Sequence, residues 1–346
     1  MKEVDETFEE NMNDKSDLTD LQAEVQALYD AGVPLFTKAA IRDALRQLEE
    51  VWSSGSAAEI QIAGVDGKVV SLGTAPGDWE RPDELEDWRV HPHLEYHSLV
   101  SLLHGDFNPE HARLPIRVCT TCWRGRQDGN PLTSELMMHE FDRLRAEWEA
   151  SQPCTELRRL IQDARVPRVD KIIAFAFASM NRTRTGELYR RSALQHCLIL
   201  TLRDLLTTST LNSNEVRCFA QDPDYGDTDK TTLTSHGVCV LEDPRGFLEV
   251  DDNSAILSAN PDVPIRDIVT DLARPAMMIW NDPGDGPDHG LNEDEEGNQC
   301  GTTWTMADPN SPRLRALLDE HYVRIAFPGG IYSDELGNLA IFVRKA

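Results

Sequence analysis

Residues 171–178 read KIIAFAFA, an apolar run that is short and rich in Ile and Phe, and this composition predicts a buried strand. Similar runs recur at residues 216–220, 238–241, 255–257 and 276–280. Helical patterns separate them, because leucines recur at three- and four-residue steps from Arg191 to Leu206, and shorter helices are expected at residues 228–236 and 265–272. Strands that alternate with helices at this spacing predict an α/β fold with a Rossmann-like, mostly parallel sheet flanked by helices.

The loops that follow these strands hold the candidate ligand-binding residues. In an open parallel sheet, ligands bind beyond the carboxyl ends of the strands, where connections diverge to opposite faces. Asp222 closes the second strand, where a carboxylate can accept hydrogen bonds from ribose hydroxyls, but Asp222-Pro223 is also typical of a simple strand-ending turn. Both interpretations stay open. The candidate residues are Ser179, Asn181, Asp222, Asp224 and Asn260.

A family resemblance rests on the order of several segments in this part of the chain. They are the strand at Ile172, Gln195 in the next helix, CFAQDP at residues 218–223, the helix and strand at 233–241, residues 255–258 and Trp280-Asn281. Over residues 169–281 this succession resembles the SRR1-like family, named from the plant "sensitivity to red light reduced" protein. The phrase FLEVDD at residues 247–252 resembles the fungal branch. The resemblance implies a regulatory role of the signalling, circadian or stress type, without an agreed biochemical activity.

Two departures from the family fall on ligand-facing loops. The family carries a glycine-bearing turn after the first strand, whereas this chain has FASMN at residues 177–181. Many members have Pro-His-Cys after the fourth strand, whereas this chain has Asn260-Pro261-Asp262. Without glycine, backbone N–H groups do not easily approach a pyrophosphate, so a dinucleotide is not expected.

The predicted fold and the family resemblance are consistent with two functions. The first is a regulatory protein without catalytic residues, which works through a protein partner or a small-molecule ligand. The second is an S-adenosylmethionine-dependent, methyltransferase-like enzyme, with S-adenosylmethionine or a nucleotide held by Asp222 or Asp224 on the ribose and by Ser179, Asn181 and Asn260 around it. Methyl transfer requires mainly that donor and acceptor are held in line, so this enzyme needs no catalytic triad.

The composition limits the partners. The 346 residues carry a formal net charge of −26, and such a field repels the phosphate backbone, so direct nucleic-acid binding is not expected. No run of about 18 apolar residues could span a membrane, and no secretory signal is visible, so we expect a cytoplasmic or nuclear protein. Seven cysteines without framework spacing are typical of a reducing compartment.

Histidines and cysteines gather in the first half of the chain. Five histidines fall between His91 and His111, and Cys119 and Cys122 follow shortly after. Two thiolates and two imidazoles could hold zinc. The histidines show no fixed step into a helix and there is no second cysteine pair, so we interpret the group as loop histidines and reduced thiols, with zinc as the alternative.

The chain is expected to divide into three parts. Residues 1–20 are acidic and almost devoid of apolar side chains, which predicts a disordered tail. Residues 21–150 predict two helices, a β-hairpin around Asp66-Gly67 and further helices, which together pack on the core as an annex. The alternative is a separable N-terminal domain with a boundary near residues 151–153. Residues 151–346 form the core, with an acidic loop at 282–298 and a final antiparallel strand pair at the edge of the sheet.

Overall fold

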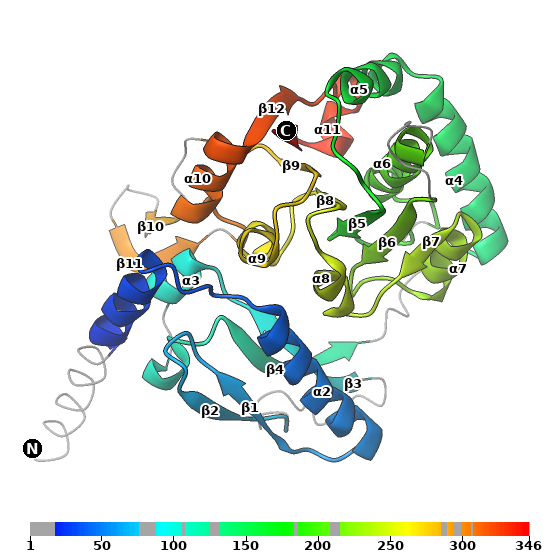
Figure 1. Ribbon diagram of the computed structural model, residues 1–346. Coiled ribbons are helices and arrows are strands. Elements are labelled where there is room, and N and C mark those ends of the chain that lie inside the picture. The colour runs from blue at the N-terminus through cyan, green and yellow to red at the C-terminus, as the bar shows by residue number, and fades with distance from the viewer. Residues whose placement is uncertain are drawn as a thin grey trace, which may run out of the picture. The chain divides into compact units, whose positions relative to one another are not determined.

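Strand β5 (Lys171–Phe175) is buried along its whole length and lies in the middle of a seven-stranded sheet. The sheet order is β12-β13-β9-β8-β5-β6-β7, in which the strands from β9 to β7 are parallel and β13 runs antiparallel to both β9 and β12. The expected Rossmann-like sheet with an antiparallel strand pair at its edge is therefore confirmed (Figure 1). The other strands are β6 (Arg217–Gln221), β7 (Val238–Val240), β8 (Ser254–Ser258), β9 (Met277–Asn281), β12 (Tyr322–Ala326) and β13 (Leu339–Arg344).

The computed structural model describes residues 18–75, 88–105, 108–124, 132–182, 186–207, 215–284, 289–293, 299–305 and 307–345. Contacts divide the chain into two units. Unit 1 comprises residues 1–125, 266–271 and 285–311, and unit 2 comprises residues 126–265, 272–284 and 312–346. The sheet of seven strands lies in unit 2.

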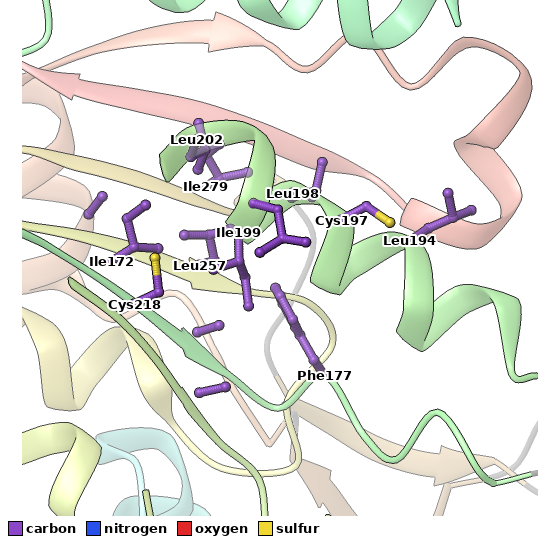
Figure 2. Packing of buried hydrophobic residues seen from close by; sticks show 14 of the residues in the cluster. Ile172, Phe177, Leu194, Cys197, Leu198, Ile199, Leu202, Cys218, Leu257 and Ile279 are labelled. Carbon is purple, nitrogen blue, oxygen red and sulfur yellow. The ribbon is translucent and has the colours of Figure 1, made fainter. Parts of the chain in front are cut away.

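One face of the sheet is covered by α6 (Arg190–Thr207), whose side chains pack on alternate residues of the strands. Figure 2 shows Leu198, Ile199 and Leu202 of this helix beside Ile172, Leu257 and Ile279 of three strands. The helix is apolar on nearly every side because α4 (Ser134–Glu149), α5 (Gln152–Asp163) and α11 (Ser333–Leu336) pack on it in turn. Trp148 Nε1 of α4 donates to Thr201 Oγ1 of α6 at 2.9 Å.

The other face of the sheet carries α8 (Arg245–Glu249). Phe247 of this helix stacks on Phe175 at the end of β5, with ring centroids 4.8 Å apart. Gly246 lies so close to the sheet that an added Cβ would come within 2.6 Å of Gln221 Oε1. The remaining helices of unit 2 are α7 (Asp227–Ser235), α10 (Pro312–His321) and the 3-10 turn η3 (Gly330–Tyr332).

The described residues of unit 1 form three two-stranded antiparallel sheets. The expected β-hairpin is confirmed, with Gly67 at φ +76° between its strands. Helix α2 precedes this hairpin, and Thr37 caps its first turn by accepting a hydrogen bond from the Ala40 N–H. The elements of this unit are a helix at residues 18–30, α2 (Lys38–Ser54), β1 (Glu59–Ala63), β2 (Val69–Gly73), β3 (Trp88–Tyr96), α3 (Leu99–His104), η2 (Pro109–His111), β4 (Ile116–Arg124), β10 (His289–Glu293) and β11 (Gln299–Thr305).

Helix α9 (Ile265–Leu272) follows β8 in sequence, but its residues 266–271 belong to unit 1. Asp271 Oδ2 accepts hydrogen bonds from the backbone N–H groups of Leu35 at 2.7 Å and Phe36 at 3.0 Å. Arg266 is buried and its Nε lies 2.8 Å from Asp308 Oδ2. Three distant chain segments therefore meet around this helix within unit 1.

Two sequence expectations require correction. Residues 18–20 of the expected disordered tail are helical, whereas residues 1–17 lie outside the described part of the chain. The expected acidic loop at 282–298 contains strand β10, which pairs with β11. Charge and glycine content suggested a loop there, but residues 289–293 pair with a strand further along the chain and are therefore extended. Among the described residues, no helix is long and apolar enough to cross a membrane.

Candidate functional site

The topological switch point of the sheet lies between β5 and β8. The chain passes from β5 through α6 to β6 on one side, and it reaches β8 on the other side of β5 only after β7 and α8. Connections that diverge in this way leave room for a ligand beyond the carboxyl ends of the two strands. The loops after β5, β6 and β8 carry all five residues that the sequence predicted as ligand-binding.

The loop after β5 has an unusual backbone. Ala176 and Ala178 adopt φ values of +58° and +57°, in the left-handed region that favours glycine. The Ala176 N–H donates to the Gln221 carbonyl at 3.2 Å, and the Ala178 N–H donates to Asp222 Oδ2 at 2.7 Å. Ser192 Oγ of α6 donates to the Ala178 carbonyl at 2.8 Å. The chain therefore keeps a glycine-type turn at this place although it has no glycine there.

We expect that Ala176→Gly and Ala178→Gly each raise the free energy of unfolding by about 1 kcal/mol, because relief of the left-handed strain exceeds the added entropy of the unfolded glycine. Urea denaturation measures this change. The matched control is Ala174→Gly, in strand β5 and fully buried, which should lower the stability instead. If all three variants are destabilised alike, the backbone of this loop is not under strain.

Asp222 and Asp224 hold the same loop from the end of β6. Asp222 accepts a second hydrogen bond from the Asp224 N–H at 2.8 Å, through its Oδ1. Asp224 Oδ2 lies 3.3 Å from the Ser179 backbone nitrogen, which donates to it, and 3.9 Å from Arg182 Nε. Burial raises the pKa of Asp222, and its two backbone hydrogen bonds oppose that change. Each carboxylate oxygen of Asp222 accepts one backbone hydrogen bond and retains a lone pair for a further donor.

Asp229 is a residue that sequence reasoning missed. This buried carboxylate of α7 accepts three hydrogen bonds, from Ser179 Oγ at 2.7 Å, from the Met180 N–H at 2.8 Å and from the Gly226 N–H at 3.0 Å. Burial raises its pKa. Asp229 therefore ties the loop after β5 to the first turn of α7. An acidic residue at the third position of a helix was the available signal, because such residues accept hydrogen bonds from the backbone that precedes the helix.

A buried histidine lies behind the loop. His196 Nδ1 is 2.7 Å from the Ser192 carbonyl, which can only accept, so Nδ1 carries the proton. Nε2 then accepts from the Tyr225 hydroxyl at 2.7 Å. Burial lowers the pKa of His196 to about 4, which keeps the ring neutral, and raises the pKa of Tyr225. This pair fixes the loop after β6 to α6.

Asn181 and Asn260 are placed differently. The Asn181 amide contacts the segment before α4, since its Oδ1 accepts from the Leu132 N–H at 3.1 Å, and its Nδ2 lies 3.3 Å from Thr228 Oγ1. Asn260 pairs with Asn281 at the end of β9. Hydrogen bonds within the loops after β5 and β6 thus join Ser179, Asn181, Asp222 and Asp224 into one group, while Asn260 belongs to a second group.

The alternative of a zinc site concerns β3 and β4 of unit 1. Cys119 lies in β4 opposite His93, and its side chain is half-buried. Cys122 lies in the same strand, opposite Val90, and its side chain lies outside the described residues. His97 contacts Glu95 at 3.2 Å and Ser101 at 3.3 Å. Within the described ranges, no three His, Cys, Asp or Glu side chains are grouped so that they could hold a metal ion.

Comparisons with known proteins give one family. Comparison with curated proteins and comparison with solved structures each gave no significant match. The matched segment begins in α5 and includes β5 to β9, the loops after β5, β6 and β8, and α6 to α9. Residues 155–310 match the model of the SRR1 domain, and this match supports the assignment of that part of the chain to the SRR1-like family.

Proposed function

We propose that this chain is a regulatory protein of the fungal branch of the SRR1-like family, with residues 151–346 as its core, and that it binds a small ligand beyond β5, β6 and β8. The observation that supports this proposal is the left-handed backbone at Ala176 and Ala178. Each such residue costs about 1–2 kcal/mol, and strain of this kind persists where surrounding contacts impose it, often at ligand-binding loops.

The contacts around the loop favour a ligand that carries hydroxyl groups. Asp222 and Asp224 are half-buried and both follow the second strand of the core. Asp222 accepts one backbone hydrogen bond at each carboxylate oxygen, which leaves lone pairs for a further donor. A ribose or a similar diol would donate to such carboxylates. Because three segments already hold the loop, little further ordering is needed when the ligand binds, and this favours affinity.

The regulatory step requires a change in what the protein contacts. A ligand shifts an equilibrium only by its differential affinity for two states, so the bound and free forms must differ in the strand-end loops or in a surface that a protein partner recognises. We infer that this partner is a protein rather than a nucleic acid, because the formal net charge is −26. The site of action is the cytoplasm or the nucleus.

The second candidate function is an S-adenosylmethionine-dependent, methyltransferase-like enzyme. It is favoured by the way the sheet ends, since β13 runs antiparallel between β9 and β12, as in methyltransferase-like folds. This support is an analogy of fold, and one fold serves many functions. The donor would occupy the same place, with its ribose on Asp222 or Asp224 and its remaining groups near Ser179, Asn181 and Asn260.

A thermal-shift scan tests both candidates. We expect S-adenosylmethionine, its homocysteine product or a nucleotide to stabilise the protein, by about 2.7 kcal/mol at a hundredfold excess over the dissociation constant. Asp224→Asn should weaken this shift because it replaces an acceptor by a donor, whereas Asp227→Asn on the exposed start of α7 should not. Methyl transfer to an added acceptor would select the enzyme. If no compound shifts the melting temperature, ligand binding at this place loses its support.

A further inference from the structure

A second group of polar side chains lies at the ends of β8 and β9. The Asn260 N–H donates to Asn281 Oδ1 at 2.6 Å, so this atom of Asn281 must be the amide oxygen. Asn281 Nδ2 then donates to Asn260 Oδ1 at 3.0 Å. Because its oxygen accepts from Asn281, the exposed Asn260 side chain presents its NH₂ group as the free end. The orientation of both amides is therefore fixed by one backbone N–H.

Three nitrogen donors converge above Gly337. An ideal Cβ on this glycine would lie 3.4 Å from Asn260 Nδ2, 3.9 Å from Arg191 Nη2 and 4.0 Å from Asn281 Nδ2. Gly337 adopts φ +73° and ψ −166°, a conformation that is open to glycine but not to other residues, so the backbone itself keeps this space free of a side chain. Guanidinium and amide NH₂ groups donate hydrogen bonds and do not accept them.

Arg191 differs from its neighbour in the first turn of α6. Arg190 lies 3.0 Å from Glu147 Oε1 and 3.8 Å from Glu335 Oε1, so its charge is compensated. Arg191 is half-buried, and among the residues that the structure describes it makes no hydrogen bond or ion pair. Its position in the first turn of an 18-residue helix also places it where the helix dipole favours negative charge.

We propose that Arg191, Asn260 and Asn281 form a binding site for an oxyanion over Gly337, and that the ligand carries a carboxylate or a phosphate group. The inference rests on the proposed function, because it names the charged group of the ligand that binds beyond the strands. Donors from three chain segments surround one point, and only an acceptor satisfies them. An uncompensated guanidinium adds the preference for a negative charge. A neutral ligand would leave that charge without a partner.

The experiment is a titration with inorganic phosphate and, separately, with acetate, with sodium chloride adjusted to keep the ionic strength constant. The melting temperature and the heat of binding are both recorded. For the wild type we expect a saturable effect, and the anion with the lower apparent dissociation constant identifies phosphate or carboxylate as the better fit. Phosphate also stabilises proteins without binding, but that effect does not saturate and does not depend on one arginine.

Three variants locate the site. Arg191→Gln should raise the apparent dissociation constant at least tenfold, and Asn260→Asp should do the same because it places a carboxylate among the donors while Asp still tolerates the positive φ of +51°. Arg190→Gln is the matched control and should leave anion binding unchanged. Absence of saturable binding in the wild type, or equal binding by all four proteins, would overturn the proposal.

The outcome is separable from that of the ligand scan. Suppose that S-adenosylmethionine or a nucleotide binds in a manner that depends on Asp224, while neither anion binds at Arg191. The proposed ligand-binding function then stands and the oxyanion site is wrong. Suppose instead that an anion binds through Arg191 and no compound of the scan has an effect. The oxyanion site then stands, and the true ligand carries the same charged group on a different body.

Discussion

Asp229→Ala is expected to lower the free energy of unfolding by about 4.5 kcal/mol, since one buried carboxylate accepts three hydrogen bonds and each bond to a charged group contributes about 1.5 kcal/mol. The loss leaves the Ser179 hydroxyl and the N–H groups of Met180 and Gly226 without their acceptor. Ser179 and Met180 are buried, so water does not easily replace it. Urea denaturation of the purified variant measures the change.

The same helix provides the control. Asp227 is exposed in the first turn of α7, so Asp227→Ala removes one carboxylate of equal charge and should cost less than about 1 kcal/mol. Asp229→Asn should fall between the two, because an amide keeps one acceptor but turns its NH₂ group toward donors. Equal losses for Asp229→Ala and Asp227→Ala would show that the three hydrogen bonds do not hold the loop.

Much of the fold is predictable from local patterns. The apolar run from residue 171 gives β5, and the leucine spacing from Arg191 to Leu206 gives α6 with an error of one residue at each end. Both elements are rich in apolar side chains at regular spacing, so the sequence pattern alone predicts that they are buried. The expected helix at residues 265–272 coincides with α9. Glycine at residue 237 ends α7 with a positive φ of +76°.

What the sequence does not reveal depends on contacts between distant residues. Asp229 lies 50 positions from Ser179, and no local pattern joins them. The left-handed turn at Ala176 and Ala178 was missed for a related reason: alanine gives no sign of a positive φ, and the carboxylate of Asp222 that holds the turn is more than 40 residues away. The two interpretations of Asp222 stay compatible, because a carboxylate that caps a loop still has lone pairs for a hydroxyl.

The set of chain segments that make up unit 1 was also not predictable from the sequence. The sequence predicted parts that are contiguous in the chain. Unit 1 instead combines residues 1–125 with residues 266–271 and 285–311. The contacts are specific: Arg266 pairs with Asp308 in a buried ion pair, and Asp267 Oδ2 accepts a hydrogen bond from the Leu99 N–H at 3.3 Å. Partners more than 40 positions away explain why these charged groups of α9 are buried.

His196 should make unit 2 less stable in acid. Its pKa is about 4 in the folded protein and 6.5 in the unfolded chain, so the unfolded state binds more protons between these values. The free energy of unfolding therefore decreases as the pH falls from 6.5 toward 4, by about 3 kcal/mol in total. Hydrogen exchange of α6 amides, corrected for the intrinsic rate, measures the loss. His196→Gln, which does not titrate, should flatten this dependence.

Asp267 should act in the opposite direction in unit 1. Burial, together with Asp308 and Asp271, raises its pKa from 3.8 to about 7, and the hydrogen bonds from Ser311 and from the Leu99 backbone only partly oppose this. Its contribution to stability is complete below pH 3.8 and is lost, by about 4 kcal/mol, as the pH rises through 7. As the pH falls from 6.5 toward 4, protection of the α9 amides from hydrogen exchange should therefore increase, while protection of the α6 amides decreases. Asp267→Asn should abolish only the change in α9. Parallel pH dependences in the two helices would contradict both assignments, since a single cooperative unfolding reaction would then govern the whole chain.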